Sequence, residues 1–163
     1  MNIVGVRIDG RLVHGQVANL WTPKLQADRI IVLDEQIIND NIQKSGLRMA
    51  TPRTTHLSVL DYKTAADHLL NDRYGTQRLL LVAKRPKEFL DLIDEGVKID
   101  SINVGTMSQT NTTQMITKQI NVEQEDIKVF DELNAKGVHL FAQLNPSVEA
   151  HDFMKLLNDK INR

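Results

Sequence analysis

Short aliphatic segments recur along the chain and predict a series of β-strands. The most apolar of them are typical of strands buried on both faces, as in a parallel sheet. The predicted strands occupy Ile3–Val6, Arg29–Leu33, Thr55–Val59, Arg78–Ala83, Ile99–Val104 and Val138–Leu144. The run Arg78–Ala83 is the most apolar in the chain, so it is expected at the centre of the sheet.

Between these strands, apolar residues recur at helical spacing. Helices are therefore expected from Val17, over Asn39–Ala50, from an Asp61 cap to Leu70, from Pro86 to Gly96, over Glu123–Ala135 and from a Ser147 cap onward. The segment Thr110–Val122 departs from this order, because apolar and polar residues alternate there, and it predicts a partly antiparallel excursion. Strands that alternate with helices predict a single α/β domain over residues 1–163, with an open, doubly wound, mostly parallel sheet and helices on both faces.

Composition and charge exclude several kinds of site and partner. The 163 residues include 20 basic and 21 acidic side chains, and the formal charge of -1 favours neither nucleic acid nor anionic lipid as a partner. Aromatic residues make up 4% of the chain, too few for base-stacking platforms. Without cysteine there is no disulfide, thiolate nucleophile or cysteine-ligated metal. No signal segment and no apolar run of roughly 20 residues is found, which predicts a cytoplasmic protein.

The densest group of reactive side chains lies in Arg7–Val17, which reads R-I-D-G-R-L-V-H-G-Q-V. This segment joins the first predicted strand to the first predicted helix. In open α/β sheets, ligands bind at the carboxyl ends of the strands, where loops and helix amino-termini meet. Right-handed crossovers would bring to that edge the loops that follow Ile8, Leu33, Ala83, Val104 and Leu144. The function is therefore expected along this edge.

His14 is the candidate nucleophile of this loop. It falls where the loop becomes a helix, so the N–H groups of Gly15 and Gln16 would point toward a bound anion. The positive end of the helix dipole disfavours imidazolium and favours a dianionic phosphoryl group, which suits both the free and the modified ring. Four other histidines lie in predicted strands and helices and are interpreted as structural or solvated: His56, His68, His139 and His151.

The charged neighbours of His14 have more than one interpretation. Arg11 offers a fork of donors for phosphate oxygens, and this role is favoured slightly over a solvated loop charge. Asp9 either orients the imidazole or holds Arg11, and a turn-forming role before Gly10 has equal weight. Arg7 is interpreted as a charge at the end of a strand rather than as a ligand.

Small and polar residues complete the predicted site. Gln16 would donate to a phosphate oxygen or face solvent, and Gly15 allows close approach of the backbone. At the end of a later strand, three residues line the same cleft or cap the strand: Asn103, Gly105 and Thr106. The pair Lys84–Arg85 is interpreted as a solvated loop rather than as a basic rim of the cleft.

The Arg7–Val17 segment resembles the active-site signature of the IIB component of the mannose/fructose/sorbose family of the bacterial phosphoenolpyruvate-dependent sugar phosphotransferase system. Supporting resemblances lie at Ile30–Asp34, Ile102–Met107 and Leu144–Pro146. The resemblance implies an open, mostly parallel sheet and a phosphohistidine at His14. It also implies that a IIA protein or domain donates the phosphoryl group from its own phosphohistidine. The group then passes to a sugar that enters through the membrane components IIC and IID.

The resemblance assigns roles to the rest of the loop as well. Arg11 would neutralise the phosphoryl group, and Asp9, Gly15 and Gln16 match the same loop. Many members of the family carry an acidic residue where this chain has Gly10. In-line displacement at phosphorus requires positioning and charge neutralisation, so neither a metal nor a cofactor is expected.

A phosphohistidine carrier must be reached by two partner proteins in turn. His14 is therefore expected on an open surface, ringed by apolar residues such as Leu12 and Val13 that would meet a partner. The resemblance implies a cytoplasmic protein that associates with the inner face of the membrane through IIC and IID.

Two other functions use the same residues. A non-catalytic phosphate- or nucleotide-binding regulatory α/β domain would bind an anion at this loop without turnover, but the motifs G-x-G-x-x-G and G-x-x-x-x-G-K-[ST] are both absent. A receiver-like phosphoaspartate switch would use Asp9 or Asp34, yet the acidic pair and lysine that such a switch needs are not found in the sequence.

Overall fold

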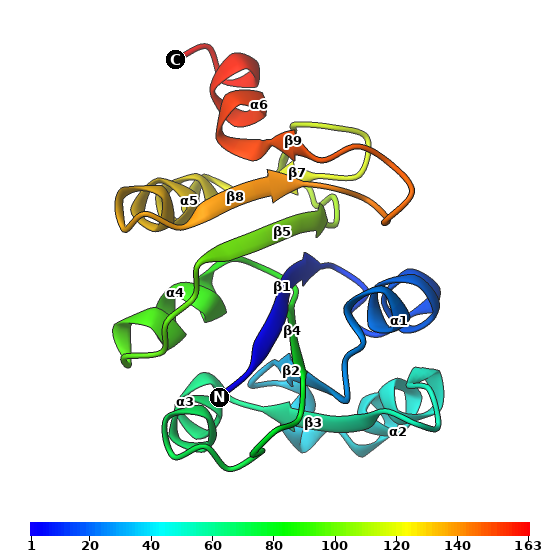
Figure 1. Cartoon of the computed structure of the whole chain (residues 1–163). Helices are drawn as coiled ribbons and strands as arrows, with labels where there is room; N and C mark the ends of the chain where they lie inside the picture. Colours follow the sequence, from blue (N-terminus) through cyan, green and yellow to red (C-terminus); the bar gives the residue numbers. More distant parts are fainter.

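The computed structural model describes all 163 residues and is built around a seven-stranded sheet with helices on both faces (Figure 1). Its strands lie in the order β3-β2-β4-β1-β5-β8-β9. In that order they span His56–Leu60, Arg29–Leu33, Leu79–Ala83, Ile3–Asp9, Ser101–Thr106, His139–Ala142 and His151–Asp152. All neighbouring pairs are parallel except β8 and β9, which confirms the predicted open, mostly parallel sheet.

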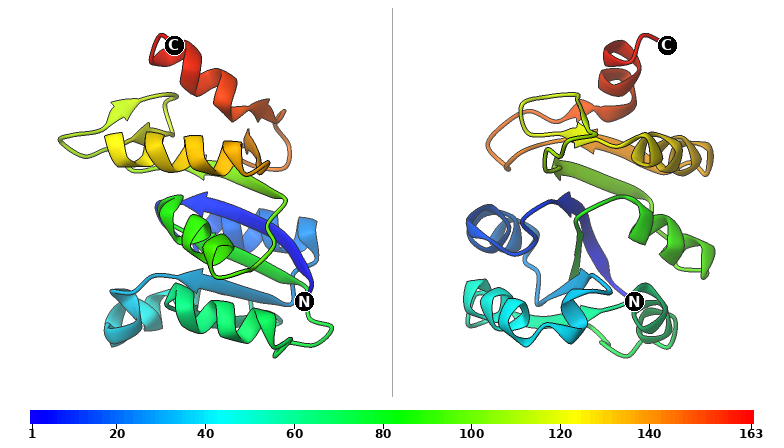
Figure 2. Two further views of the ribbon diagram at one scale, coloured as in Figure 1. Left: turned by 90° about the vertical axis from the view of Figure 1, so that its left-hand side faces the viewer. Right: turned by 180° about the vertical axis from the view of Figure 1, so that it is seen from behind.

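Helices cover both faces of this sheet, and the segments on the first face are mostly shorter than those on the second (Figure 2). The first face carries the π-helical segment η1, the short helix α1, the 3-10 turn η2 and the helix α2, which span Val17–Trp21, Thr22–Leu25, Ile37–Asn39 and Asn41–Ala50. The second face carries α3, α4 and α5, which span Tyr62–Leu70, Lys87–Asp94 and Gln124–Ala135. The last helix, α6 (Phe153–Lys160), follows the edge strand β9.

Each face of the sheet has its own apolar core. A cluster of 30 buried residues lies on the side of α3, α4 and α5, and a cluster of 12 lies on the side of η1, α1 and α2. Along β2, Ile31 and Leu33 belong to the larger cluster, whereas Ile30 and Val32 belong to the smaller one. Successive side chains of a strand point to opposite faces, so a strand covered on both faces is apolar throughout.

The segment after β5 leaves the parallel sheet and forms a small hairpin. We call Met107–Val122 the hairpin segment; within it, β6 (Gln114–Met115) pairs antiparallel with β7 (Asn121–Val122). This arrangement confirms the predicted antiparallel excursion. The buried side chains of Ile116 and Ile120 fix the hairpin segment on the larger core.

The carboxyl-terminal part of the chain differs from the prediction. The last helix begins after Asp152, whose side chain accepts from the N–H of Lys155, so the predicted Ser147 cap is wrong. Ser147 instead donates both its hydroxyl and its N–H to the side chain of Asn145, which stabilises a turn. This turn lets His151–Asp152 return antiparallel to β8, and β8 ends at Ala142 rather than at Leu144.

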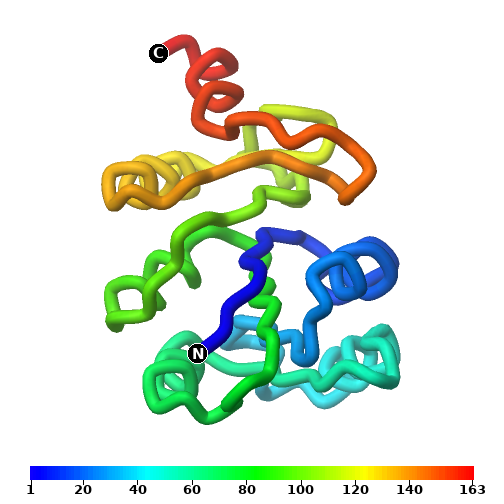
Figure 3. Tube along the Cα trace, viewed as in Figure 1, coloured from blue at the N-terminus to red at the C-terminus, as the bar shows by residue number.

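The first strand lies in the middle of the sheet, between β4 and β5 (Figure 3). From the carboxyl end of β1 the chain passes to η1 and α1 on the first face, whereas from β5 it passes through the hairpin segment to α5 on the second face. Connections that leave neighbouring strands toward opposite faces open a crevice between the strand ends. None of the helices has the length and hydrophobicity of a transmembrane segment.

Candidate functional site

His14 lies in the loop between β1 and the first helical residue, Gly15. Its carbonyl oxygen accepts the N–H of Ala18 at 2.8 Å, so the ring stands at the first helical turn. Two residues earlier, Leu12 has a φ of 60°, a left-handed conformation that is rare and strained for a bulky side chain. The turn folds the loop back on itself, and the His14 imidazole contacts Asp9 at the end of β1.

Leu12 and Val13 fasten this loop to the protein. They are 2% and 4% exposed and pack in the smaller core beside Val17 and Trp21. The prediction that they surround His14 on the surface is wrong, because both side chains fill the space between the sheet and the first helical segment. Their burial fixes the backbone from which the half-buried His14 side chain projects.

Asp9 orients the imidazole of His14. Its Oδ1 lies 2.9 Å from Nε2 of His14, and the same oxygen accepts the N–H of Arg11 and the hydroxyl of Thr106, each at 3.0 Å. An ionised carboxylate is an acceptor only, so Nε2 carries the proton and donates. In the neutral ring the other nitrogen, Nδ1, then keeps its lone pair, and it makes no hydrogen bond within the chain.

Asp9 is fully buried but remains ionised at neutral pH. Burial by itself would raise the pKa of its carboxyl group, but the hydrogen bond with His14 and the positive charge of Arg7 lower it, and the net pKa lies below the ordinary value. The hydrogen bond from the Arg11 N–H acts in the same direction. A buried negative charge thus stands directly behind the imidazole.

Arg7 is the counter-charge of Asp9 and is 1% exposed. Its Nε donates to Oδ2 of Asp9 at 3.1 Å, and its two terminal nitrogens donate to the carbonyls of Gln143 and Leu144 at 2.9 Å. The guanidinium also lies over the ring of Trp21, 5.2 Å from the centroid. Arg7 lies near the end of β1, as interpreted from the sequence, but its charge is buried and supports Asp9.

Gly105 makes room for Arg7. A Cβ added to Gly105 would overlap the terminal atoms of the Arg7 guanidinium, so no other residue fits beside this side chain without a shift. Gly105 thus makes room for the buried ion pair and is not among the residues that line the hollow opening beside His14. Asn103, on the same face of β5, is 5% exposed and lines a small separate cavity with Trp21 and Leu25. The expectation that Asn103 lines the cleft is wrong, because it lies inside the strand rather than at its end.

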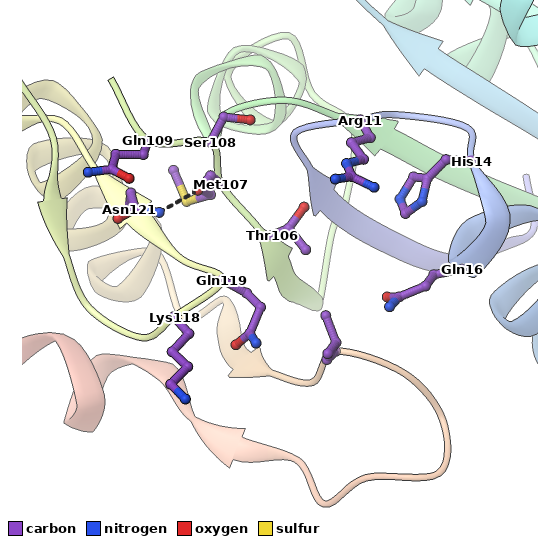
Figure 4. Close-up of a pocket in the computed structure, with 11 residues that line it drawn as sticks. Arg11, His14, Gln16, Thr106, Met107, Ser108, Gln109, Lys118, Gln119 and Asn121 are labelled. Carbon is purple, nitrogen blue, oxygen red and sulfur yellow. Dashed lines mark hydrogen bonds between the residues drawn. The ribbon is translucent and has the colours of Figure 1, made fainter. Parts of the chain in front are cut away.

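A hollow of about 410 Å³ opens beside His14 (Figure 4). The loop after β1 contributes Arg11, His14 and Gln16; the end of β5 and the hairpin segment contribute Thr106, Met107, Ser108, Gln109, Lys118, Gln119 and Asn121; the loop after β8 contributes Leu144. Two of these residues are cationic and none is acidic. The hollow is therefore suited to an anion, and its walls come from three loops at the carboxyl edge of the sheet.

Arg85 holds the wall of this hollow that the hairpin segment forms. Its guanidinium donates to the carbonyl of Ser108 and to that of Asn121, both at 3.3 Å, and forms an ion pair with Asp126 at 2.8 Å. The interpretation of Lys84–Arg85 as a solvated loop is wrong for Arg85, which links the two ends of the hairpin segment to α5. Sequence reasoning missed the hairpin residues, since only long-range contacts bring them to His14.

Gly10 joins the two loops that face each other across the site. Its N–H donates to the carbonyl and hydroxyl oxygens of Thr106, each at 3.1 Å. A Cβ at Gly10 would overlap the hydroxyl of Ser108. An acidic side chain at this position would therefore require Ser108 to move. Gly15, in contrast, has open space where a Cβ would lie, so it does not require glycine for steric reasons.

Comparison with known proteins reveals the family. A family model described as "PTS system sorbose subfamily IIB component" matches residues 3–163. The chain belongs to this IIB family. A fructose-specific EIIB component of Bacillus subtilis (strain 168) is 35% identical to it over 159 residues, which are 98% of each chain. The IIB identity confirms the resemblance of the Arg7–Val17 segment to the family signature.

Two further relatives are similar to this IIB component, one in structure and one in sequence. The crystal structure of the IIBSor domain of the sorbose permease from Klebsiella pneumoniae is 29% identical, with a TM-score of 0.93 and 98% of each chain covered. A mannose-specific EIIAB component of Escherichia coli (strain K12) is 34% identical over 139 residues, which are 85% of this chain and 43% of that protein. This IIB component is thus a phosphotransferase of the sugar phosphotransferase system and acts in sugar uptake.

Proposed function

We propose that His14 accepts a phosphoryl group from a phosphohistidine of IIA and passes it to a sugar that enters through the membrane components IIC and IID. The observation that carries this proposal is the 2.9 Å contact between Nε2 of His14 and the buried carboxylate of Asp9. Because Nε2 donates to Asp9, Nδ1 is the nitrogen with a free lone pair, and it is the atom that attacks phosphorus.

The transfer is an in-line displacement in which one P–N bond forms while another breaks. The lone pair of Nδ1 attacks the phosphorus of the donor phosphohistidine, and the donor imidazole leaves with the electron pair of its P–N bond. The His14 ring then carries phosphorus on Nδ1 and a proton on Nε2, so the ring itself is positive. The negative charge of Asp9 compensates this ring charge, and it does so without any group having to move.

Arg11 is the group best placed to neutralise the phosphoryl oxygens. Its backbone N–H is fixed by Asp9 at 3.0 Å, while its guanidinium makes no hydrogen bond within the chain and lines the hollow. Gly15 and Gln16 lie in the first helical turn, where backbone N–H groups lack helical partners and bind anions. Thr106 supports the site indirectly, through its hydrogen bond to Asp9.

The hollow and the exposure of His14 support a carrier that meets other proteins. The His14 side chain is 20% exposed, and a donor and an acceptor must each reach it in turn. One of the relatives is named as a combined EIIAB protein, which supports a IIA protein as the donor. We place this chain, as one domain over residues 1–163, in the cytoplasm at the inner face of the membrane, held there through IIC and IID.

The relatives carry the names of three different sugars: fructose, mannose and sorbose. Their identities to this chain lie between 29% and 35%, so similarity to the IIB chain follows no single sugar. This supports assigning sugar selection to the membrane components, with the IIB chain supplying the phosphoryl group.

The experiment that tests this function is a phosphorylation assay. The protein is incubated with phosphoenolpyruvate, the general phosphocarriers and a IIA protein, and the expected product is an acid-labile, base-stable phosphate. His14→Ala should abolish labelling, whereas His56→Ala, at an exposed histidine remote from the loop, should leave it unchanged. NMR of the labelled ring should give an Nδ1 phosphate; labelling that survives in His14→Ala, or a phosphate on Nε2, would overturn the proposal.

A further inference from the structure

A second hollow with cationic walls lies at the opposite edge of the sheet from His14. It has a volume of about 280 Å³, and its polar lining consists of Arg29, Arg48, Arg53, His56, Thr51 and Thr55. Arg29 and His56 are the first residues of the parallel strands β2 and β3 and are paired in register. The hollow therefore opens at the amino ends of these strands, whereas His14 follows the carboxyl end of β1.

The charges around this hollow are not compensated. No carboxylate lines it, and the guanidinium groups of Arg48 and Arg53 make no hydrogen bond or ion pair within the chain. The imidazole of His56 is also without a partner. The nearest acidic residue in sequence is Asp28, and its carboxylate accepts the N–H of Arg78 at 2.8 Å. Like charges repel one another, so such a cluster persists in a folded protein at a cost that an anion would relieve.

One of the arginines is already held in a fixed position. Nε of Arg29 donates to Gln77 at 2.7 Å and one terminal nitrogen donates to Ser58 at 2.8 Å. The guanidinium lies over the ring of Tyr74, 4.7 Å from the centroid. Arg29 contributes to the lining, but its guanidinium is held by Gln77, Ser58 and Tyr74, which lie outside the hollow, so Arg48 and Arg53 supply the free donors.

We propose that this hollow binds a small phosphate ester of the size of a sugar phosphate. Guanidinium groups match phosphate oxygens in bidentate geometry, and the two free guanidinium groups of Arg48 and Arg53 suit a dianion. The volume lies near the lower end of small-molecule sites, which fits a phosphate with one sugar-sized substituent. Pro52 and Leu57 supply an apolar wall for the carbon skeleton. This site is independent of the phosphoryl transfer at His14.

The test is isothermal titration of the full chain with glucose 6-phosphate, with glucose as the uncharged control. The double variant Arg48→Gln/Arg53→Gln should weaken binding by about a hundredfold, because it removes both free guanidinium groups that would contact the phosphate. Arg73→Gln changes another arginine whose side chain makes no hydrogen bond, outside the hollow, and should leave affinity unchanged. Phosphorylation of His14 should be normal in the double variant.

Three results would overturn the proposal. The first is the absence of binding by the wild-type chain. The second is binding that Arg11→Gln removes and the double variant keeps, because the anion would then lie beside His14. The third is a chain that binds phosphatidylglycerol vesicles more tightly than phosphatidylcholine vesicles and does not bind glucose 6-phosphate. The basic cluster would then recognise a lipid surface. Thermal unfolding of each variant shows whether the fold is retained.

Discussion

Substitution of Gly105 by alanine tests whether the space beside Arg7 determines the reactivity of His14. The φ of Gly105 is not positive, so alanine is compatible with the backbone. Its Cβ would nevertheless overlap the guanidinium of Arg7 and force it to shift. Arg7 would then lose the alignment of its hydrogen bonds to Asp9, Gln143 and Leu144, which measure 2.9–3.1 Å.

The magnitude follows from the burial of this pair. Arg7 and Asp9 are 1% and 0% exposed, and removal of one partner of a buried ion pair typically costs about 3–5 kcal/mol. A shifted guanidinium keeps part of its interaction, so Gly105→Ala should lower the free energy of unfolding by about 3 kcal/mol. The pKa of Asp9 should rise because burial is then less well compensated, and phosphorylation of His14 should slow.

Urea unfolding at pH 7, followed by circular dichroism, measures the change in free energy. Gly46→Ala is the matched control: no atom lies within 4 Å of the added Cβ, and alanine in α2 should stabilise the fold by about 1 kcal/mol. A double-mutant cycle with Arg7→Met isolates the mechanism, since a methionine side chain ends before the atoms that alanine would overlap. The reasoning is refuted if Gly105→Ala unfolds like the wild type, or if its cost is unchanged in the Arg7→Met background.

Three further substitutions test other parts of the structure. Asp9→Asn removes the charge behind the imidazole and should slow the phosphorylation of His14 by about a hundredfold. A phosphorylation rate close to that of the wild type would contradict the role of Asp9. Arg85→Gln should slow the phosphorylation of His14 by about tenfold, because it frees the hairpin segment at Ser108 and Asn121, while the far-UV circular dichroism spectrum stays native. An unchanged phosphorylation rate would show that the hairpin wall of the hollow does not depend on Arg85. Burial, together with the charges of Asp34 and Asp91, raises the pKa of Glu88 to about 7, above its ordinary value of 4.5. Between pH 4.5 and pH 7, Glu88 loses its proton in the unfolded chain but keeps it in the folded chain, so the free energy of unfolding falls as the pH rises. Above pH 7 the carboxyl group is ionised in both states and the loss of stability is complete. Glu88→Gln should therefore gain about 2 kcal/mol at pH 8 and nothing at pH 4 in urea unfolding, and an equal gain at both pH values would refute this titration.

The six parallel strands were predictable because each carries aliphatic residues in a short run or in alternation. β2 and β4 are buried on both faces, so their sequences alone identify them, and Asp61 caps α3 as its position before an apolar periodic run predicts. The end of the chain was not predictable in the same way. Ser147 and Asp152 are both suitable capping residues, and the choice between them depends on the pairing of β9 with β8, which local sequence does not show.

The site was predictable where it is local and was missed where it is not. His14, Arg11 and Asp9 lie within six residues of one another, and their side chains were recognisable from the strand-to-helix junction. Arg7 was interpreted as a charge at the end of a strand, and its burial depends on contacts with Gln143 and Leu144, 136 and 137 positions later. One signal was present in the sequence: Arg7 and Asp9 are two residues apart on a strand, so they share one face, and opposite charges on a covered face indicate a buried pair.

The orientation of the His14 ring depends on residues that are distant in the sequence. Asp9 is the last residue of β1, next to the loop, but its carboxylate is held by Thr106 at the end of β5 and by Arg7. The remaining donors of Arg7 reach the loop after β8. The loop sequence placed in another sheet would keep every residue of the motif and lose the contacts that fix the proton on Nε2. Reactivity therefore belongs to the crevice between β1 and β5 rather than to the motif alone, and this is why a methyl group at Gly105, outside the motif, should alter the chemistry of His14.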